Sequence, residues 1–513
     1  MKLSHLLKDI DVLRIAGEPE GEVSSVCYDS KRCDKNSLFV AVPGFSREGH
    51  AYIPEAIARG AGFIIHERDF TPPPGVTAIK VGNSRRVLGI LGKNFYGHPS
   101  AELCLVAVMG TNGKTTITYL LEAILKAAGC SVGVLGTVNY RYRDRVLPAP
   151  NTTPESFEFQ KILREMADSG VTHVIAEVSS HAVDLRRVDD CAFDLGIFSN
   201  LSQDHLDYHE TMENYFQAKL RFFTEILPAG GKRRPYKMII NGDDPWGRRI
   251  LKETAEPFLT FGMGKENDTE VMGEIISLSS AGIRAIIHRG PASFAVASFF
   301  IGRFNLYNIL AAAAAAFALN VPEKFIREGI EGLTGVPGRL EKVSTSQEPA
   351  VFVDYAHTED ALMRVLQNLS EFRRGRIITV FGCGGNRDRG KRPLMGRAAA
   401  ASSDVTIITS DNPRREDPLE IIREIESGME KNRVIKMSPE ELAVNGTRKC
   451  YTILPDRKKA IELAVGLAGK DDTVLIAGKG HEDCQIVGDQ RFPFDDRQVT
   501  RQALDARRKG FSR

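Results

Sequence analysis

The sequence has little that would place it among secreted disulfide-bonded proteins or zinc proteins. Its eight cysteines are scattered over 513 residues, and no two of them form a C-x-x-C pair. Closely spaced cysteine pairs are typical of zinc sites and of disulfide frameworks. The first 17 residues, MKLSHLLKDIDVLRIAG, also lack the apolar core of a signal peptide and predict an amphipathic helix. We therefore expect reduced thiols and a cytoplasmic protein.

An excess of charge and a long apolar run are missing as well. Lys and Arg total 68 against 66 for Asp and Glu, so the formal net charge is +2. A protein that binds nucleic acid over its whole surface needs many cations, so this balance argues against one but allows a local basic groove for a small anion. The longest apolar run, Ile309 to Leu319, is shorter than the roughly 20 residues of a membrane helix. We expect no nucleic-acid or membrane partner, and a monomer.

Three segments follow one another along the chain, as a length of 513 residues predicts for domains of roughly 150 residues. Residues 1–100 contain short β-type runs such as SLFVAV and GFIIHE. Residues 101–335 and 336–513 each alternate apolar strands with helices, which is typical of parallel sheets covered on both faces. Such sheets bind ligands at the carboxyl ends of their strands. Six runs end there in small or polar residues: MGTNGKTT, AEVSSH, VDYAH, FGCGGN, TSDNPRR and AGKGHE.

The motif GTNGKTT, residues 110–116, follows an apolar strand and precedes a helix-like run. Glycines let backbone N–H groups surround phosphate oxygens at a helix N-terminus. Lys114 would neutralise phosphate, and the Thr115 hydroxyl would bind Mg²⁺. Val108 stands where the usual spacing puts the first glycine, so the loop is a variant, and a glycine-rich turn with a chance lysine is the alternative. We predict an ATP-binding loop of Gly110, Thr111, Asn112, Gly113, Lys114, Thr115 and Thr116.

Two further polar residues follow predicted strands and are candidate metal ligands. Glu177 ends the run THVIAEVSS, and His205 lies in NLSQDHLDYH. Mg²⁺ prefers oxygen, so His205 alone is weak evidence, and Glu177 could equally be a solvated loop residue. Lys219, in the helical run NYFQAKLRFF, would by itself be assigned to a helix surface.

Ten motifs in one order give a specific resemblance. GTNGKTT, EVSSHA, NLSQDHLDYH, YFQAK, GRFNLYN, GVPGR, DYAHT, GCGGNRDRGKRP, DNPRREDP and GKGHE occur as in the Mur ligases. The resemblance implies an α/β protein of three domains: a small N-terminal α/β domain for a UDP-linked substrate (1–100), a central P-loop parallel-sheet ATPase domain (101–335) and a C-terminal Rossmann-like domain for an amino acid (336–513). The implied reaction is ATP-dependent amide formation through an acyl phosphate. The chain is most similar to the members that add meso-diaminopimelate to UDP-N-acetylmuramoyl-L-Ala-D-Glu in peptidoglycan precursor synthesis.

The same resemblance implies roles for the metal and nucleotide residues. Lys219 would carry CO₂ as a carbamate (N6-carboxylysine), which turns a cation into an oxygen ligand. Thr115 and Glu177 would hold one Mg²⁺, and His205, carbamylated Lys219 and Glu177 a second. Lys114, Glu177, His205 and Lys219 are the expected catalytic set. Further ATP contacts would come from Asn305, Arg339 and Asp354; Asn308 is a weaker candidate, and both asparagines could instead cap the alanine-rich helix predicted from about Leu306.

The muramoyl dipeptide would meet residues of the first two segments. The implied contacts are Ser30 in CYDSKR, Asn151, Thr152 and Thr153 in PNTTPES, then Ser179 and Arg187. The Thr-Thr-Pro run could also be a plain helix start. Phe45, Ser46 and Arg47 depart from the family's usual loop, and Leu185 replaces a common glutamine, so no contact is carried over to them.

The motif DNPR, residues 411–414, points to the amino-acid substrate. Diaminopimelate has a second carboxylate that lysine lacks, and a guanidinium binds a carboxylate through two parallel hydrogen bonds. Arg414 is the natural partner, although Arg415 could share the role, and a solvated turn before a basic surface is the alternative. The implied contacts are Arg387, Asp411, Asn412, Pro413, Arg414, Gly478 and Glu482.

Three rival functions have different signatures. A folylpolyglutamate synthase or a lysine-adding ligase would lack DNPR together with an N-terminal domain that carries DSK. A P-loop motor would need a basic channel, which the balanced charge disfavours. A non-catalytic ATP-binding module would have no need of Thr115, Glu177, His205 and Lys219 as a set.

Overall fold

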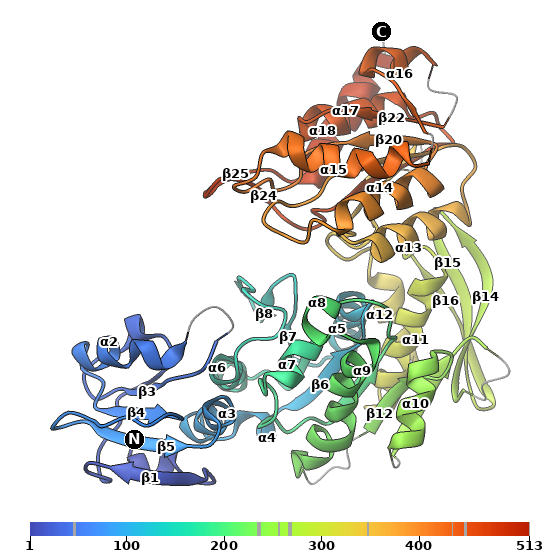
Figure 1. Ribbon diagram of the computed structural model, residues 1–513. Helices are drawn as coiled ribbons and strands as arrows, with labels where there is room; N and C mark the ends of the chain where they lie inside the picture. Colours follow the sequence, from blue (N-terminus) through green and yellow to red (C-terminus); the bar gives the residue numbers. More distant parts are fainter. Residues whose placement is uncertain are drawn as a thin grey trace. The chain divides into compact units, whose positions relative to one another are not determined.

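The computed structural model describes residues 1–44, 48–232, 237–254, 257–264, 269–345, 348–432, 434–445 and 449–511 (Figure 1). Phe45, Ser46 and Arg47, where the sequence departs from the Mur ligase pattern, lie outside the described residues. The chain folds into two compact units. Unit 1 is Met1–Val271 with Leu310–Gly329, and unit 2 is Met272–Ile309 with Ile330–Arg513.

The first hundred residues form a five-stranded sheet in the order β1-β5-β4-β3-β2. The predicted N-terminal amphipathic helix is wrong: helix α1 covers only Leu3–Leu6, and residues 12–16 are strand β1. Asp9 adopts φ 63°, which ends the helical turn, and β1 then pairs antiparallel with β5. The elements are β1 (Val12–Ala16), β2 (Val26–Cys27), the 3₁₀ turn η1 (Ser30–Arg32), β3 (Leu38–Val40), α2 (Ile53–Ala58), β4 (Phe63–His66), β5 (Thr77–Val81), α3 (Ser84–Phe95) and α4 (Pro99–Glu102).

Unit 1 also contains the predicted central parallel sheet, with strands in the order β13-β12-β11-β6-β10-β7 and the antiparallel pair β8-β9 at its edge. The strands are β6 (Cys104–Met109), β7 (Val132–Leu135), β8 (Tyr140–Tyr142), β9 (Arg145–Leu147), β10 (His173–Glu177), β11 (Leu195–Phe198), β12 (Lys237–Asn241) and β13 (Phe258–Gly262). The helices are α5 (Lys114–Ala127), α6 (Ser156–Asp168), α7 (Ser180–Asp184), α8 (Leu206–His209), α9 (Met212–Arg221) and α10 (Pro245–Glu253). Parallel pairing brings the ends of β6, β10, β11 and β7 to one edge of the sheet.

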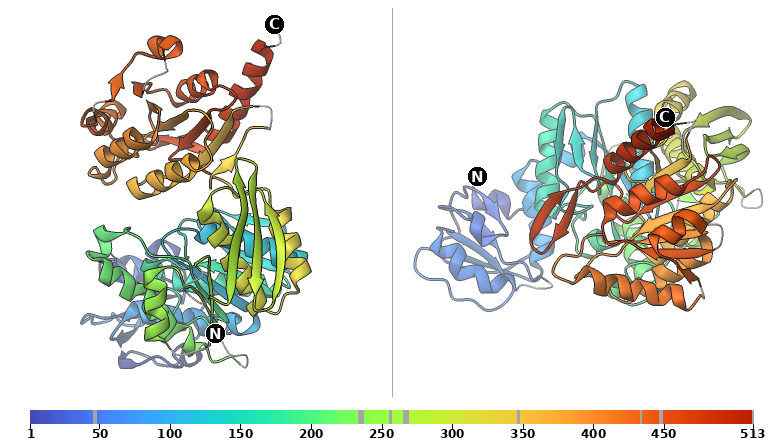
Figure 2. Two further views of the ribbon diagram at one scale, coloured as in Figure 1. Left: turned by 90° about the vertical axis from the view of Figure 1, so that its right-hand side faces the viewer. Right: turned by 90° about the horizontal axis from the view of Figure 1, so that it is seen from above.

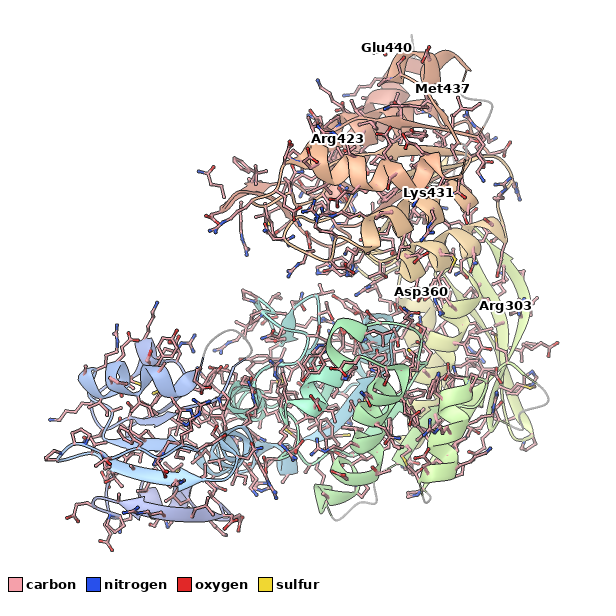
Figure 3. All side chains as sticks on the ribbon, in the orientation of Figure 1. Arg303, Asp360, Arg423, Lys431, Met437 and Glu440 are labelled. Carbon is pink, nitrogen blue, oxygen red and sulfur yellow. The ribbon has the colours of Figure 1, made fainter. Side chains whose placement is uncertain are left out.

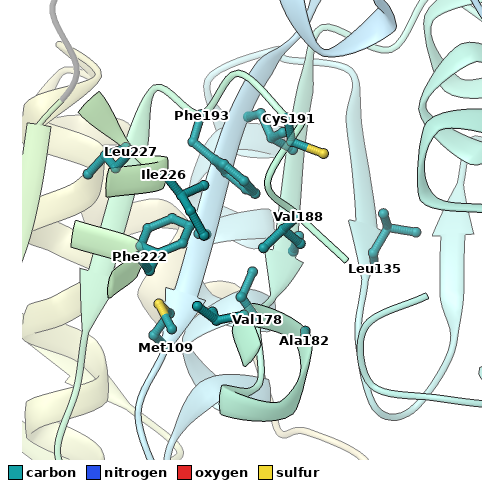
Figure 4. Close-up of a cluster of buried hydrophobic side chains, with 14 of the residues drawn as sticks. Met109, Leu135, Val178, Ala182, Val188, Cys191, Phe193, Phe222, Ile226 and Leu227 are labelled. Atoms are coloured by element: carbon teal, nitrogen blue, oxygen red, sulfur yellow. The ribbon is translucent and has the colours of Figure 1, made fainter. Parts of the chain in front are cut away.

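A buried hydrophobic cluster holds Tyr215, Phe216 and Leu220 of helix α9 against this sheet. Figure 4 shows part of this cluster, including Phe222 and Ile226 from the turn after α9. After α9 the chain continues as a π-helical turn, Phe222–Ile226, an irregularity that often accompanies functional sites. The Phe222 ring lies 5.1 Å from that of Phe193. A side chain at Gly196 of β11 would begin 2.8 Å from the Phe222 ring, so glycine is what allows this close packing.

Unit 2 contains a seven-stranded sheet in the order β17-β18-β23-β19-β20-β22-β21, parallel except for β17. The predicted strands in this half of the chain are confirmed. The elements are β17 (Glu341–Lys342), β18 (Ala350–Asp354), α13 (Glu359–Ser370), β19 (Ile377–Phe381), α14 (Lys391–Ser402), β20 (Val405–Ile408), α15 (Pro418–Glu430), β21 (Ile435–Lys436), α16 (Pro439–Asn445), β22 (Cys450–Ile453), α17 (Arg457–Leu467), β23 (Thr473–Ala477), β24 (Cys484–Val487), β25 (Gln490–Pro493) and α18 (Asp496–Phe511).

Helix α15 illustrates how the helices cover this sheet. Ile421, Ile422 and Ile425 are buried on one face. Arg423 points outward from the opposite face and pairs with Glu420 (Figure 3). This division into an apolar and a charged face is typical of a helix that covers a sheet.

Some elements were not predicted. Strands β14 (Val271–Ser279), β15 (Gly282–Arg289) and β16 (Ala292–Ser298) lie side by side, and β15 and β16 are antiparallel (Figure 2). The β24-β25 hairpin is also antiparallel. Helix α11 (Arg303–Ala318) is the predicted alanine-rich helix, and α12 (Glu323–Gly332) follows it. Over the described ranges, no helix combines the length and the apolar character needed to cross a membrane.

Candidate active site

The predicted phosphate loop connects β6 to α5. Gly110 and Gly113 have φ values of 141° and 88°, and a side chain at Gly110 would begin 1.9 Å from the Ser199 hydroxyl oxygen. Glycine at these positions is therefore a requirement of the backbone. The Lys114 ammonium donates to the carbonyls of Gly110 and Thr111, both at 2.9 Å. A nucleotide phosphate would take the place of these carbonyls as acceptor.

The segment after β11 holds the loop in shape. The backbone N–H of Asn112 donates to Asn200 Oδ1 at 3.0 Å, and the Ser199 hydroxyl donates to the Asn112 carbonyl at 2.7 Å. The Thr111 hydroxyl donates to the Ser202 carbonyl at 3.2 Å. Sequence reasoning missed Ser199, Asn200 and Ser202, although NLS directly follows a predicted strand.

Glu177, at the end of β10, is 1% exposed, which rules out the solvated-loop alternative. Its Oε2 accepts from the hydroxyls of Thr115 at 3.2 Å and Thr137 at 2.8 Å, and its Oε1 accepts from the Thr137 N–H at 3.1 Å. A side chain at Gly136 would begin 2.4 Å from Oε1. The carboxylate is therefore oriented toward Thr115 of the phosphate loop, as expected for two ligands of one metal. Thr137 was not predicted; its signal is a polar residue directly after β7.

Lys219 is also 1% exposed, so it is not a surface residue of its helix. Its Nζ donates to the Gly110 carbonyl at 3.2 Å and lies 4.7 Å from the centre of the Tyr215 ring. Burial, reinforced by the nearby Lys114 charge and opposed by Asp204, holds the pKa of this amine well below its ordinary value. In the part of the chain that the structure describes, Lys219 forms no ion pair with a carboxylate. Burial therefore favours the neutral form of this amine over the ammonium.

His205 lies at the start of α8 with φ 54°. Its ring is 4.8 Å from that of His181 and 6.1 Å from that of Tyr215, which also contacts Lys219. Its Nε2 is 3.4 Å from Asp204, and 44% of its side chain is exposed. The structure thus brings His205 to the neighbourhood of Lys219, and its role as a metal ligand stays a prediction.

A second set of predicted residues joins Glu177 from the other side. The Thr153 hydroxyl donates to the Glu177 carbonyl at 2.9 Å, and the Ser179 N–H donates to Thr153 Oγ1 at 3.2 Å. Arg187 Nη1 donates to the Thr153 carbonyl at 3.1 Å. Thr153, Ser179 and Arg187, predicted to meet the muramoyl-peptide end of a substrate, are therefore brought together beside the predicted metal carboxylate.

Thr152 joins the same network, whereas Asn151 is exposed. The hydroxyls of Thr152 and Thr137 are 3.0 Å apart and hydrogen bonded. The alternative interpretation of the Thr-Thr-Pro run as a helix start is wrong. Helix α6 begins at Ser156, and the Glu155 side chain caps it by accepting from the Ser156 N–H.

Ser30 lies in a cavity of 350 Å³ in unit 1. Its hydroxyl donates to Glu55 Oε2 at 2.8 Å. Glu155 also lines the cavity and pairs with Arg187 at 3.3 Å, which connects the cavity wall to the Thr153 network. The other lining residues are Tyr28, Asp29, Lys31, Phe39, Val42, Gly49, Tyr52, Arg85 and Leu88.

In unit 2, Asn305 and Asn308 are buried within α11. Asn308 Nδ2 donates to Asn305 Oδ1 at 2.9 Å, and Asn305 Nδ2 donates to the Ile301 carbonyl at 2.9 Å. The helix begins at Arg303, three residues before the predicted start, so the helix-capping alternative for the two asparagines is wrong. Their contact with adenine stays a prediction.

Asp354, at the end of β18, accepts from the N–H groups of Leu340 at 2.6 Å and Ala356 at 2.7 Å. Burial raises the pKa of this carboxyl, although Arg339 and the two N–H groups oppose the shift. The Arg339 guanidinium lies 5.1 Å from the centre of the Tyr355 ring. Asp354 therefore links GVPGR to DYAHT, which the sequence separates by a strand.

Asp411 and Gly478 follow β20 and β23 and lie together. A side chain at Gly478, whose φ is 115°, would begin 2.5 Å from Asp411 Oδ2. Burial raises the pKa of Asp411, and the charges of Arg457 and Lys479 oppose that shift. Arg457 also donates to the Ala477 carbonyl at 3.0 Å, which ties the end of β23 to this region.

Asn412 and Glu482 both accept a hydrogen bond from Lys479, a fully buried lysine that the sequence analysis did not predict. Lys479 Nζ donates to Asn412 Oδ1 at 3.0 Å, to Glu482 Oε2 at 2.9 Å and to the Cys484 carbonyl at 2.6 Å. Asn412 Nδ2 donates to Glu482 Oε2 at 2.8 Å. Burial alone would raise the pKa of Glu482, but the Lys479 charge and these hydrogen bonds outweigh it and hold that pKa below its usual range. The signal is the lysine inside GKGHE.

The β24-β25 hairpin fixes the backbone of Arg414. The Arg414 N–H donates to the Ile486 carbonyl at 3.0 Å, and the Gly488 N–H donates to the Arg414 carbonyl at 2.7 Å. These bonds hold Arg414 at φ 51°, which is rare for a residue with a side chain. Arg414 Nη1 donates to the Gly385 carbonyl at 2.9 Å. A side chain at Gly385 would begin 1.9 Å from the Pro413 carbonyl oxygen, so the GCGGN and DNPR loops are in contact.

The two adjacent arginines of this loop differ in their partners. Arg415 is exposed and pairs with Asp489 at 2.8 Å. Over the described ranges, neither Arg414 nor the exposed Arg387 forms an ion pair with a carboxylate. Arg414 is thus the better placed of the two neighbours to take up a carboxylate from a ligand.

Comparisons with known proteins agree on the family. Family models match residues 22–96 (Mur ligase family, catalytic domain), 108–316 (Mur ligase middle domain) and 338–480 (Mur ligase, glutamate ligase domain). The chain is 44% identical over 97% of both chains to a UDP-N-acetylmuramoyl-L-alanyl-D-glutamate--2,6-diaminopimelate ligase of Geobacter metallireducens. It is 41% identical to the protein of that name from Geobacillus thermodenitrificans, over 99% of this chain and 100% of the relative.

A solved structure agrees in fold and length. A structure of a UDP-N-acetylmuramoyl-L-alanyl-D-glutamate--2,6-diaminopimelate ligase is similar with a TM-score of 0.69 and 30% identity over 99% of each chain. The family models cover most of the chain, and the relatives match it from end to end. The chain therefore belongs to the Mur ligase family.

Proposed function

We propose that this protein joins diaminopimelate to UDP-N-acetylmuramoyl-L-Ala-D-Glu in the cytoplasm, with ATP as the energy source, as a step of peptidoglycan precursor synthesis. The observation that carries the proposal is the position of Glu177. Its carboxylate accepts from Thr115 of the phosphate loop, while its backbone carbonyl accepts from Thr153 of the predicted muramoyl-peptide set. A nucleotide phosphate and an acceptor carboxylate would therefore meet at one residue. The names of the two relatives supply the two substrates.

The amino acid would be recognised in unit 2. Arg414 has a guanidinium that is not neutralised by a described carboxylate, and it suits the carboxylate that diaminopimelate has and lysine lacks. Glu482, kept ionised by Lys479, suits the neighbouring ammonium. This pairing favours meso-diaminopimelate over lysine, and Arg387, Asp411 and the Asn412 amide are further contacts.

The residues of the phosphate-loop region fit Mg²⁺. The Thr115 hydroxyl and Glu177 carboxylate are oxygen donors that already contact each other at 3.2 Å, as a hard cation prefers. We propose that these two hold one ion and that His205 and carbamylated Lys219 contribute to a second, with Glu177 shared. Bound Mg²⁺ would offset the charge of ATP and of the acceptor carboxylate.

Carbamylation of Lys219 is consistent with its surroundings. A buried ammonium without a carboxylate partner is costly, and a neutral amine can add to CO₂. In that step the amine nitrogen forms a bond to the carbon of CO₂ and loses one proton to water, which leaves an anionic carbamate. The modification would supply oxygen ligands where the sequence has a lysine.

The proposed reaction has two steps. The γ-carboxylate of D-Glu attacks the γ-phosphorus of ATP, which forms an acyl phosphate and releases ADP. The amine of diaminopimelate then attacks the acyl carbon, and phosphate leaves with formation of the amide. Lys114 and the loop N–H groups would stabilise the transferring phosphoryl group, so the protein acts mainly by positioning and charge stabilisation.

The proposed function is tested by product mass spectrometry. The protein is incubated with Mg-ATP, the UDP-muramoyl dipeptide and equimolar diaminopimelate and lysine. We expect the diaminopimelate amide as the dominant product, with one ADP per amide formed. A dominant lysine product would overturn the amino-acid assignment, and ATP hydrolysis without amide would overturn the ligase assignment. Stimulation of hydrolysis by DNA or RNA would instead favour the motor alternative.

Replacing Lys479 by methionine should weaken diaminopimelate binding and make it more sensitive to acid. Methionine has an unbranched side chain of similar length to lysine, but it lacks the charge that lowers the pKa of Glu482. We expect KM for diaminopimelate to rise about tenfold, as for the loss of roughly 1.4 kcal/mol. Because the Glu482 pKa rises, kcat/KM for diaminopimelate should fall at a higher pH than in the unmodified protein. The measurement is a pH profile from about 5 to 8, and an unchanged profile would contradict this role; KM for ATP is the control.

A further inference from the structure

Two cysteines lie in contact behind the cavity that contains Ser30. Cys27 ends β2, and Cys33 directly follows η1. Their sulfur atoms are 2.7 Å apart, and both residues are buried. Six positions separate them in the sequence, so the C-x-x-C spacing that marks many reactive pairs is absent here. The fold alone brings the two thiols together.

The two thiols are chemically unequal. The hydrogen bond between them lowers the pKa of Cys33 and raises that of Cys27. The thiolate is the nucleophilic form of cysteine. Cys33 is 8% exposed and Cys27 5%, and Cys33 lies between the exposed residues Arg32 and Asp34.

We propose that Cys27 and Cys33 form a reversible disulfide when a hydroperoxide oxidises them, and that this bond changes the shape of the adjacent cavity. Its effect on the UDP-linked substrate rests on the proposed function. The pair would thus be a redox-sensitive modification site in the predicted substrate-binding region of unit 1.

The chemistry is balanced with hydrogen peroxide as the oxidant. The Cys33 thiolate attacks one peroxide oxygen; an S–O bond forms, the O–O bond breaks, and the leaving hydroxide takes a proton to become water. Cys27 then attacks the sulfenic sulfur of Cys33; the S–S bond forms, the S–O bond breaks, and a second water leaves with the Cys27 proton. The two thiols together lose two electrons to the peroxide, and a dithiol reductant reverses the reaction by thiol–disulfide exchange.

The cavity responds because the bonded pair spans its lining segment. Tyr28, Asp29, Ser30 and Lys31 lie between the two cysteines and line the cavity. Formation of the bond draws both ends of this segment together, while Ser30 remains hydrogen bonded to Glu55 on another element. Bonding shortens the sulfur separation from 2.7 Å to about 2.05 Å, and we expect this change to shift the segment relative to α2 and to alter the contact surface offered to a ligand.

The test compares the reduced and peroxide-treated full-length protein. Peptide mapping without reductant should show residues 27 and 33 cross-linked, with a loss of two hydrogens. We expect KM for the UDP-muramoyl dipeptide to rise at least fivefold after oxidation, with KM for ATP within twofold and full reversal by dithiothreitol. Cys27→Ser should instead stop at the sulfenic acid of Cys33, which dimedone labels.

Variants separate this pair from general oxidation. Cys33→Ser should keep the KM of the reduced protein under peroxide, whereas the matched control Cys130→Ser should respond like the unmodified chain. Free thiols at 27 and 33 under peroxide that oxidises Cys130 would overturn the proposal, as would a cross-link that leaves KM unchanged. Peptide mapping does not depend on turnover, so a reduced protein that never uses the UDP-linked substrate counts against the proposed function and not against the disulfide.

Discussion

Replacement of Lys219 by alanine is expected to lower kcat by about 10²–10³-fold, comparable to the loss of one preorganised stabilising group. Lys219 is buried beside the phosphate loop and has no carboxylate partner among the described residues, and the role proposed for it depends on conversion to an anion. KM for ATP and for diaminopimelate should change little, because the loop glycines and the DNPR segment remain in place. Steady-state kinetics with each substrate varied in turn measures the fall in kcat and the KM values separately.

The controls distinguish a carbamate from a structural lysine. Short carboxylic acids should partly restore activity to Lys219→Ala, because they can supply the missing oxygen ligands. Lys219→Arg keeps a long cation that does not form a carbamate, and it should stay inactive. Bicarbonate depletion should lower the activity of the unmodified protein. Full activity of Lys219→Ala with no added acid, in a protein with an unchanged melting temperature, would contradict the carbamate.

Replacement of Arg414 by alanine is expected to raise KM for diaminopimelate by about 10²–10⁴-fold. Two charge-assisted hydrogen bonds to a carboxylate, each worth roughly 1.5–3 kcal/mol, would be lost. The backbone of Arg414 is held by the β24-β25 hairpin, so the loop should keep its conformation. The KM for ATP should change less than twofold, and discrimination against lysine should fall, as a competition assay with both amino acids would measure.

Arg415→Ala is the matched control for this variant. It removes the same charge one residue further along, but Arg415 is exposed and already paired with Asp489. We expect KM for diaminopimelate within about twofold of the unmodified value, since exposed ion pairs contribute roughly 0–1 kcal/mol. Equal effects of the two substitutions would show that the arginines share the carboxylate, and unchanged kinetics in Arg414→Ala would remove the assignment to diaminopimelate.

The strands and the loops that follow them were largely predictable. Apolar runs such as those before Gly110, Glu177 and Asp411 are buried parallel strands, and their polar ends lie at the carboxyl edges of two sheets. Each prediction needed only local sequence, because a buried parallel strand is apolar throughout and stops where its polar residues begin. The phosphate loop on one side of Glu177 came from its own motif, whereas the muramoyl-peptide residues on the other side came from the resemblance.

Features that depend on distant contacts were not predictable. Strands β14–β16 are partly exposed, and β15 and β16 alternate between buried and exposed residues, so their sequence lacks the continuous apolar runs of the other strands. Thr137 matters because β7 and β10 are neighbours in the sheet, which no local pattern reveals. Nothing in the local sequence indicates that Lys479 is buried, because its partners Asn412 and Glu482 come together only in the fold. The burial of Lys219 has the same origin.

The hydrogen bonds around Glu177 also bear on reorganisation during the reaction. Both carboxylate oxygens are fixed by Thr115 and Thr137, and the backbone is fixed by Thr153. The conformational entropy of this side chain is therefore lost when the protein folds, and not when substrates bind. A carboxylate whose orientation is already fixed needs little rearrangement when charge is redistributed in the transition state. The entropy cost of orienting Glu177 is thus met by the free energy of folding and does not add to the activation free energy of the reaction.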